Sequence, residues 1–399
     1  MKIHCTKQFL HTAALLAAII YGGNSLAQAQ PGCSVVWTGN AGNGAWSTAS
    51  NWSPSQVPGP TSDVCIPTFT MADATATRSI SVHSIQVAEG ASLLFGSGKV
   101  SIATSLTNQG FITLFGTTLS AGSISEPAPG EIDSYNNSFI TSSAFSNTGT
   151  LSVGTGGTLR LADNPVQLLN GTLSGGSWLV AGVLVVPSDV SQITTQGTVV
   201  SIDGPGSAVQ DVSGNNALAT LTSVGPGAVL ALFDGASLAV AQGLSSQGVV
   251  DVGSGNGGSL TVSGTYTQAS GATTNMSAGS LSAISVSVQP QSTLRGNGTV
   301  ASSIRNNGTV APQGSLTVTG NYTQTSGSAL TEQFGSTLHV NLNATLSGAL
   351  NVTVNPKHPP QSGATYTALT FGSINGSFTT HTAGFTLTTN ANSIQVTKQ

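Results

Sequence analysis

Apolar and polar residues alternate most regularly between Leu338 and Val354. Every even position there is Leu, Val, Ala or Gly, whereas the odd positions are His, Asn, Thr, Ser or Ala. A period of two places one side of a β-strand in a core and the other side in water. The pattern predicts two half-buried strands with a turn near Ser347 and Gly348, and it places every even side chain inside.

Two stretches of the chain repeat each other almost residue for residue, GSLTVSGTYTQASG at 258–271 and GSLTVTGNYTQTSG at 314–327. Each carries apolar residues at alternating positions between glycines. These residues are Leu260, Val262 and Tyr266 in the first copy, and Leu316, Val318 and Tyr322 in the second. A strand-and-turn unit that is used more than once predicts a solenoid of stacked β coils.

A polar residue followed by glycine and two β-formers recurs through residues 79–355. The polar–glycine pairs are 109–110, 148–149, 170–171, 196–197, 247–248, 297–298 and 307–308. Glycine adopts positive φ without steric cost, so we expect these pairs to form positive-φ turns between strands. At roughly 20 residues per coil, this region would hold about 14 coils.

The composition fits an all-β fold better than a disordered chain. Only 6% of residues are charged and 5% aromatic, with 50 glycines, but 38% are hydrophobic. Disordered chains usually combine low hydrophobicity with high net charge, whereas regular Val, Leu and Ile alternation between polar turns is typical of strands. No helical pattern of comparable clarity is found after residue 29.

The first 29 residues have the features of a cleavable signal peptide. Lys2 and Lys7 precede an apolar run at 9–21, and Ala27 and Ala29 offer small residues for cleavage before Gln30. We therefore expect a protein that is secreted or held at the outer cell surface. The run is too short to span a bilayer comfortably, and we expect no transmembrane segment after its removal.

The charge balance argues against nucleic acid as a partner. Removing Lys2 and Lys7 from the nine basic residues leaves seven against thirteen acidic ones, a net charge of −6. No basic patch is visible among them.

Two cysteines, Cys33 and Cys65, remain after the signal segment, which contains Cys5. In an exported protein they most simply form one disulfide, which would stabilise the fold by about 3–4 kcal/mol in the loop-entropy model. The alternative, a metal pair, lacks nearby His or further Cys ligands. We expect neither a metal nor a cofactor.

Residues 30–78 contain three of the four tryptophans, Trp37, Trp46 and Trp52. One interpretation is a cap that covers the open end of the solenoid, where a bare first coil would expose its core and strand edges. The other is an aromatic platform that stacks on the sugar rings of a glycan. The series Trp-Thr-Gly, Trp, Asn-Trp, Pro and Asp63 resembles a module near the start of many bacterial surface and autotransporter-like proteins, where it precedes β-solenoid repeats.

The C-terminal segment 356–399 predicts about four antiparallel strands that close the far end, with Phe371, Phe378 and Phe385 as a small aromatic core. Runs across 245–399 resemble the C-terminal part of secreted bacterial autotransporter passengers. These runs are LRGNGTV (294–300), NNGTVAP (306–312), GSLTVTGNYTQ (314–324), GATYTAL (363–369) and GSF (376–378). The resemblance implies a right-handed parallel β-helix. Such passengers continue into a translocator barrel that is not found here up to Gln399, so we expect release or another mode of surface retention.

One tight acidic group could carry chemistry, namely Glu126, Glu131 and Asp133 in SEPAPGEIDSYNN. Hydrolysis of a glycosidic bond needs two carboxylates about 5–9.5 Å apart. Proline, glycine and asparagine predict a protruding, solvated loop, which could alternatively bind Ca²⁺ or substrate. The glycines of GSGNGG at 253–258 precede a predicted strand rather than a helix, so they do not indicate a pyrophosphate site.

These observations favour a non-catalytic secreted or cell-surface β-solenoid, an adhesin-like or matrix scaffold. Its partners would be surface glycans, other cells or copies of itself. Two alternatives stay open. One is a carbohydrate-active β-helix enzyme, a polysaccharide lyase or glycoside hydrolase, that uses Glu126, Glu131 and Asp133. The other is a carbohydrate-binding module that uses Trp37, Trp46 and Trp52. Whether the chain is an enzyme is left undecided.

Overall fold

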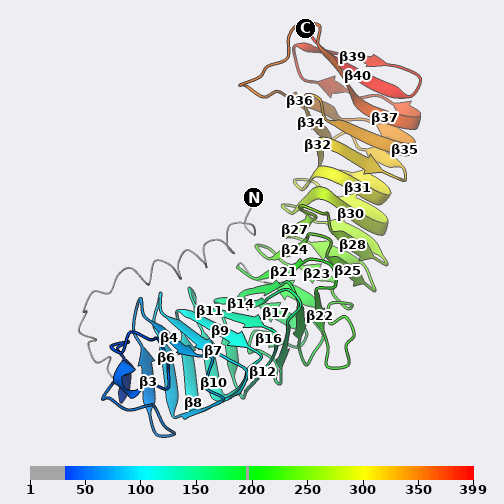
Figure 1. Cartoon of the computed structure of the whole chain (residues 1–399). Helices are drawn as coiled ribbons and strands as arrows, with labels where there is room; N and C mark the ends of the chain where they lie inside the picture. Colours follow the sequence, from blue (N-terminus) through cyan, green and yellow to red (C-terminus); the bar gives the residue numbers. More distant parts are fainter. Residues whose placement is uncertain (1–31, 195–196) are drawn as a thin grey trace. The chain divides into compact units, whose positions relative to one another are not determined.

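The computed structural model describes residues 32–194 and 197–399, and nearly all of its regular structure is β. In these ranges the single helical element is the short 3-10 turn Ala49–Asn51. The strands stack as a parallel β-solenoid of about 14 turns (Figure 1). The predicted fold class is therefore confirmed, and the predicted signal peptide 1–29 lies outside the described residues. The chain divides into two compact units, one ending at Val166 and the other spanning Gln167–Gln399.

Each coil of the first unit has three faces, and one strand or half-strand lies on each face. The first face contains β1 (Val35–Trp37), β3 (Asp63–Ile66), β6 (Ser84–Val87), the later halves of β8 (Lys99–Asn108) and β10 (Thr118–Glu126), and β13 (Phe145–Asn147). The second contains β4 (Met71–Ala74), β7 (Ser92–Phe95), β9 (Phe111–Phe115), β11 (Glu131–Tyr135) and β14 (Thr150–Val153). The third contains β5 (Ser79–Val82), the earlier halves of β8 and β10, β12 (Asn137–Ser142) and β15 (Thr158–Leu161).

The register gives the coil length directly. Cys65 in β3 pairs with Gln86 in β6, 21 residues later. This matches the coil of roughly 20 residues that the repeats predict. The parallel stacking begins at β1, which pairs with β3, within the segment predicted as the N-terminal cap.

The second unit begins with the hairpin β16 (Leu168–Leu169) and β17 (Thr172–Ser174) and continues as coils with three faces. One face contains β18 (Ser177–Val180), β21 (Val199–Asp203), β24 (Val229–Phe233), β27 (Val249–Val252), the starts of β30 (Thr273–Val288), β31 (Thr293–Asn306) and β32 (Thr309–Val318), and then β34 (Ala329–Gln333) and β36 (Ala349–Thr353). A second contains β20 (Gln192–Thr194), β23 (Ser223–Val224), β26 (Leu244–Ser246), β29 (Thr265–Gln268), the ends of β30 and β31, β33 (Tyr322–Gln324) and the end of β35 (Thr337–Leu346). The third contains β25 (Ser237–Val240), β28 (Ser259–Val262), the middles of β30 and β31, the end of β32 and the start of β35. Away from these faces, β19 (Val183–Val185) pairs with β22 (Ala208–Gln210).

The core is a set of columns in which equivalent residues of successive coils lie above one another. Tyr266 pairs with Val286, Val286 with Ile304, and Ile304 with Tyr322. The two near-identical sequence repeats are therefore three coils apart. Both tyrosines and the other four apolar residues quoted above are buried, which confirms the alternation.

The late alternation is confirmed with two exceptions. The turn lies at 347–348, between β35 and β36, as predicted. Leu342, however, is 53% exposed and Val354 also lies at the surface. Leu342 sits where the register shifts between Val340 and Asn343, so the strand bends there and its side chain leaves the core.

The glycines of the polar–glycine pairs serve two purposes, and the prediction named only one. Gly171, Gly197 and Gly298 have positive φ, as expected. Gly110, Gly149, Gly248 and Gly308 do not. A Cβ at Gly308 would come within 2.3 Å of the Gln289 carbonyl oxygen in the preceding coil. At these four corners the requirement is close approach of two backbones rather than an unusual dihedral angle.

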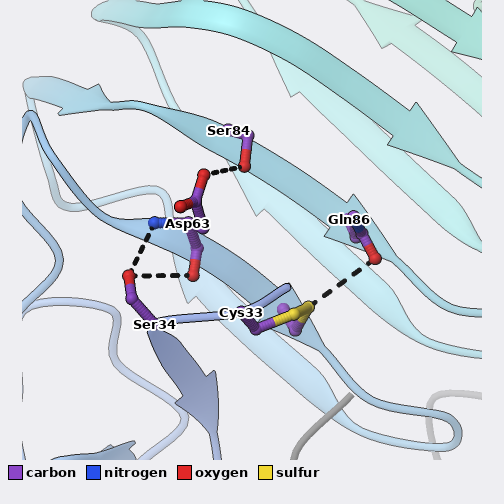
Figure 2. Close-up of a disulfide and its surroundings, with 6 residues drawn as sticks. Cys33, Ser34, Asp63, Ser84 and Gln86 are labelled. Carbon is purple, nitrogen blue, oxygen red and sulfur yellow. Dashed lines mark hydrogen bonds between the residues drawn. A yellow bond between two sulfur atoms is a disulfide. The ribbon is translucent and has the colours of Figure 1, made fainter. Parts of the chain in front are cut away.

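The N-terminal end is closed by the three tryptophans and the disulfide. Trp52 packs edge-on against both Trp37 and Trp46, with ring centroids 4.8 and 4.7 Å apart, and its Nε1 donates to the Trp46 carbonyl oxygen. Cys33 and Cys65 form the predicted disulfide, with their Cα atoms 5.9 Å apart (Figure 2). The predicted cap is confirmed.

Beside the disulfide, the Asp63 carboxylate accepts hydrogen bonds from Ser84 and from His83 Nδ1. The Ser84 hydroxyl and, after it, His83 lower the pKa of this carboxyl. Figure 2 shows Ser34 and Ser84 on either side of Asp63.

The C-terminal end is closed by β37 (Thr365–Gly376), β38 (Thr380–His381), β39 (Phe385–Thr389) and β40 (Ser393–Lys398). β40 pairs antiparallel with β37 and β39, whereas β37 and β38 also continue the parallel stack. Phe371 and Phe385 are buried as predicted, but Phe378 is half-exposed. Phe334 adds a further contact between the last coils and this segment by packing on Tyr366 and Phe385.

Candidate functional site

The acidic group does not lie on a protruding loop, so that prediction is wrong. Glu126 is the last residue of β10, and Glu131 and Asp133 belong to β11. Only a tight turn separates the two strands, closed by the Gly130 amide donating to the Pro127 carbonyl oxygen. The Pro-Ala-Pro-Gly run is thus a corner of a coil, with strands on both sides.

Glu126 points into the coil and is only 1% exposed. Its Oε1 accepts a hydrogen bond of 2.9 Å from Asn108 Nδ2, while Oε2 has no partner. Burial raises the pKa of Glu126 to about 9, against the opposing effect of the Asn108 bond, and the nearby Glu131 and Asp133 charges raise it further. The carboxyl is therefore protonated at neutral pH.

Glu131 and Asp133 lie on the outer side of β11, which belongs to the next face of the coil rather than to the face of β10. Glu131 is half-exposed, and Asp133 is only 7% exposed. Glu131 pairs in register with Phe111 on the preceding coil, and Asp133 pairs with Thr113. The structure places these two carboxylates on the outer side of a single strand, two residues apart, but only Glu131 is open to solvent to any extent. It places the third member of the predicted group on the other side of the backbone.

Aromatic side chains surround this pair of carboxylates. Phe111 and Tyr135 are 37% and 40% exposed. Phe115 stacks on Tyr135 with ring centroids 5.6 Å apart and planes 19° from parallel. Burial raises the pKa of Tyr135, and the Asp133 and Glu131 charges raise it further. We call Phe111, Phe115, Glu131, Asp133 and Tyr135 the aromatic–acidic face.

Glycine on the next coil makes room for Tyr135. A Cβ at Gly154 would lie 2.5 Å from its ring, so the tyrosine leans over a bare stretch of backbone. The sequence analysis did not identify this face. The signal was available in FITLF, where Ile112 and Leu114 take the inward phase and therefore leave Phe111 and Phe115 pointing outward.

The tryptophan platform is contradicted by the structure. Trp37, Trp46 and Trp52 are all at least 98% buried, and their rings contact one another. A ring that stacks on a sugar needs an exposed face, and none of the three has one. Burying three large aromatic side chains stabilises this end of the fold, as expected of a cap.

The remaining candidates carry little chemistry. GSGNGG joins β27 to β28 and leads into a strand, as predicted. Its later glycines line a shallow groove of small residues with Ala236, Ala278 and Gly298. His339 Nδ1 bonds the Thr370 hydroxyl at the surface. Among residues 32–194 and 197–399, no three His, Cys, Asp or Glu side chains are grouped to hold a metal ion.

In the same described ranges, no helix is long and apolar enough to cross a membrane. Comparisons with protein-family models, curated proteins and solved structures find no match for this chain. The function must therefore be argued from the coils themselves.

Proposed function

We propose that this chain is a non-catalytic, secreted or cell-surface β-solenoid that serves as an adhesin-like or matrix scaffold. The observation that carries the proposal is the outer surface of the second unit, where uncharged hydroxyl and amide side chains lie in register from coil to coil. One column runs through Ser237, Ser259, Ser280, Thr299 and Thr317.

Hydrogen bonds along and beside such columns tie one coil to the next. The Thr265 and Ser285 hydroxyl oxygens are 3.1 Å apart, and Ser373 donates to Asn343 Oδ1 over 3.0 Å. A stiff surface with few charges can contact a glycan or another copy over many coils without enclosing either. The signal segment and the autotransporter-like runs support export.

A carbohydrate-active enzyme is the second candidate, because Glu131 and Asp133 lie two residues apart on the outer side of one strand, with Glu131 half-exposed and Asp133 only 7% exposed. A glycosidase also needs a general acid with a raised pKa. Burial gives Glu126 that property, but its side chain is inside the coil and cannot reach a glycosidic oxygen. This separation favours the scaffold.

One experiment tests the two candidates together. Purified protein lacking residues 1–29 is incubated with neutral, acidic and amino-sugar polysaccharides, and new reducing ends and unsaturated products are measured. We expect no turnover, and we expect the native protein in the medium or on the outer surface of fractionated cells. Turnover that disappears in Glu131→Gln or Asp133→Asn, with the fold retained, would replace the scaffold by the enzyme.

A further inference from the structure

We propose that the aromatic–acidic face binds a polysaccharide whose sugars carry free, protonated amino groups. The inference deepens the proposed scaffold function and rests on it. It assigns to the scaffold one adhesive surface in the first unit, made by neighbouring strands β9 and β11.

The aromatic rings provide the first part of the argument. Phe111, Phe115 and Tyr135 all project from the outer side of a sheet whose inner side is apolar, and two of them remain more than one third exposed. The negative π faces of aromatic rings attract C–H groups and cations. Phe111 and Phe115 are four residues apart on an extended strand, about 13 Å, which suits the length of a short oligosaccharide.

The charges of the face provide the second part. Glu131 is half-exposed and in register with Phe111, whereas Asp133 on the same strand is only 7% exposed. Asp73 lies on the same outer side three coils earlier. The other outward residues of β4, β7, β9, β11 and β14 are Met71, Ser92, Leu94, Thr113, Thr150 and Ser152. Because no basic residue is among them, the face repels uronates and sulfated sugars and attracts ammonium groups.

The geometry of the face suits a rigid ligand. Its residues project from paired strands rather than from a loop, with Glu131 in register with Phe111 and Tyr135 in register with Phe115. Tyr135 is held between the Phe115 ring and the Gly154 backbone. A surface that is ordered before binding loses little conformational entropy when a sugar chain lies on it.

Titration calorimetry with three oligosaccharides of equal length tests the assignment. They are a glucosamine oligomer, its fully N-acetylated counterpart and an oligogalacturonate, each at mildly acidic pH and at two salt concentrations. We expect binding in the order glucosamine, N-acetylglucosamine, galacturonate. The binding of the glucosamine oligomer should weaken as salt rises.

Two sets of variants locate the site. Phe111→Leu and Tyr135→Leu keep apolar volume but remove the π faces, and each should weaken glucosamine binding about fivefold to tenfold. Glu131→Gln should weaken it by a similar factor and reduce the salt dependence. Adding Asp133→Asn should change binding little further, because Asp133 is only 7% exposed. Matched controls are Ile284→Ala, an exposed apolar side chain in the second unit, and Asp163→Asn, an exposed carboxylate. Both controls should bind like the unmodified protein, and circular dichroism should show β structure throughout.

Three results would overturn the assignment. These are preferred binding of galacturonate, equal binding by all face variants, and losses that appear in the carboxylate variants alone, which would mean general charge attraction. In each case an extracellular protein without turnover would leave the scaffold function standing. Turnover lost with Glu131→Gln would instead overturn the scaffold itself.

Discussion

The two units build the same polar corner inside their coils but complete it differently. In the first unit, Asn108 Oδ1 accepts from the Gly110 amide, and its Nδ2 donates to the Glu131 carbonyl oxygen and to Glu126. In the second unit, Asn306 makes the same three bonds, to the Gly308 amide, the Ala329 carbonyl oxygen and Tyr322. An Asn two residues before a corner glycine is therefore a recurrent device for satisfying backbone groups inside a narrow coil.

The difference lies in the next side chain of each corner. The Tyr322 hydroxyl passes its hydrogen bond to Gln324 Oε1, and Gln324 Nε2 donates to the Ser347 and Ala349 carbonyl oxygens of the following coil. In the first unit, the hydrogen-bond network stops at the Glu126 carboxyl, whose Oε2 has no hydrogen-bond partner. A chain of neutral groups can be satisfied completely inside a protein, whereas a carboxyl in the same place must hold a proton.

The largest expected effect comes from removing the side-chain amide of Asn306, which makes all three hydrogen bonds of the polar corner in the second unit. Asn306→Ala leaves the Gly308 amide, the Ala329 carbonyl oxygen and the Tyr322 hydroxyl without this partner. At about 1–3 kcal/mol per buried group, we expect the free energy of unfolding to fall by about 4 kcal/mol. Urea denaturation measures it, with Asn307→Ala at the half-exposed neighbouring position as control. Equal, small losses in both variants would remove the structural importance of the corner.

The buried Glu126 carboxyl in the polar corner of the first unit should make the stability of the fold depend on pH. The folded pKa of Glu126, about 9, lies above its ordinary value of 4.5, so the folded state holds a proton that the unfolded state releases. This contribution is fully favourable below pH 4.5 and is lost as pH rises toward 9. At pH 7 this group therefore makes the free energy of unfolding about 3 kcal/mol lower than at pH 4.5.

Glu126→Gln mimics the protonated group, so we expect it to raise stability by about that 3 kcal/mol at pH 7 and to flatten the profile in part. A residual slope should remain, because burial also raises the pKa of Glu332 in the second unit. Thermal unfolding from pH 4 to 9 measures both effects, with Asp163→Asn as the exposed control. An unchanged profile in Glu126→Gln would show that the carboxyl is not buried as described.

The smallest expected loss of stability comes from removing one hydroxyl group from the polar corner of the second unit. Tyr322→Phe keeps the ring in its column but deletes the hydroxyl between Asn306 and Gln324, and we expect a loss of about 2 kcal/mol. Tyr135→Phe, at the surface, should change stability by much less. A loss in Tyr322→Phe no larger than in Tyr135→Phe would mean that the network contributes little and that ring burial alone holds the column.

Much of the fold could be predicted from local pattern. Alternating Leu260 and Val262, the copy at Leu316 and Val318, and the turn at 347–348 gave strand positions, inward phases and coil length. The disulfide and the tryptophan cap followed from residue type and position near one end. Strand bends could not be predicted, because Leu342 continues the apolar alternation and leaves the core only where the coil turns a corner.

The candidate site was harder to predict because it depends on which residues share a side of the sheet. Glu126, Glu131 and Asp133 are neighbours in sequence, and proline and glycine between them suggested a loop. In the structure a corner lies between β10 and β11, so one carboxyl enters the core and two face outward. Phe111 and Glu131 are 20 positions apart, and only coil-to-coil register brings them side by side.

The sequence by itself determined that this protein is a stack of short β-strands with closed ends, because period-two alternation, repeats and turn residues act over a few positions. The tertiary structure alone decided which polar residues are buried, which aromatic residues are exposed and which glycines allow close packing. Those properties depend on contacts between coils, and the side chains involved lie about 20 residues apart along the chain.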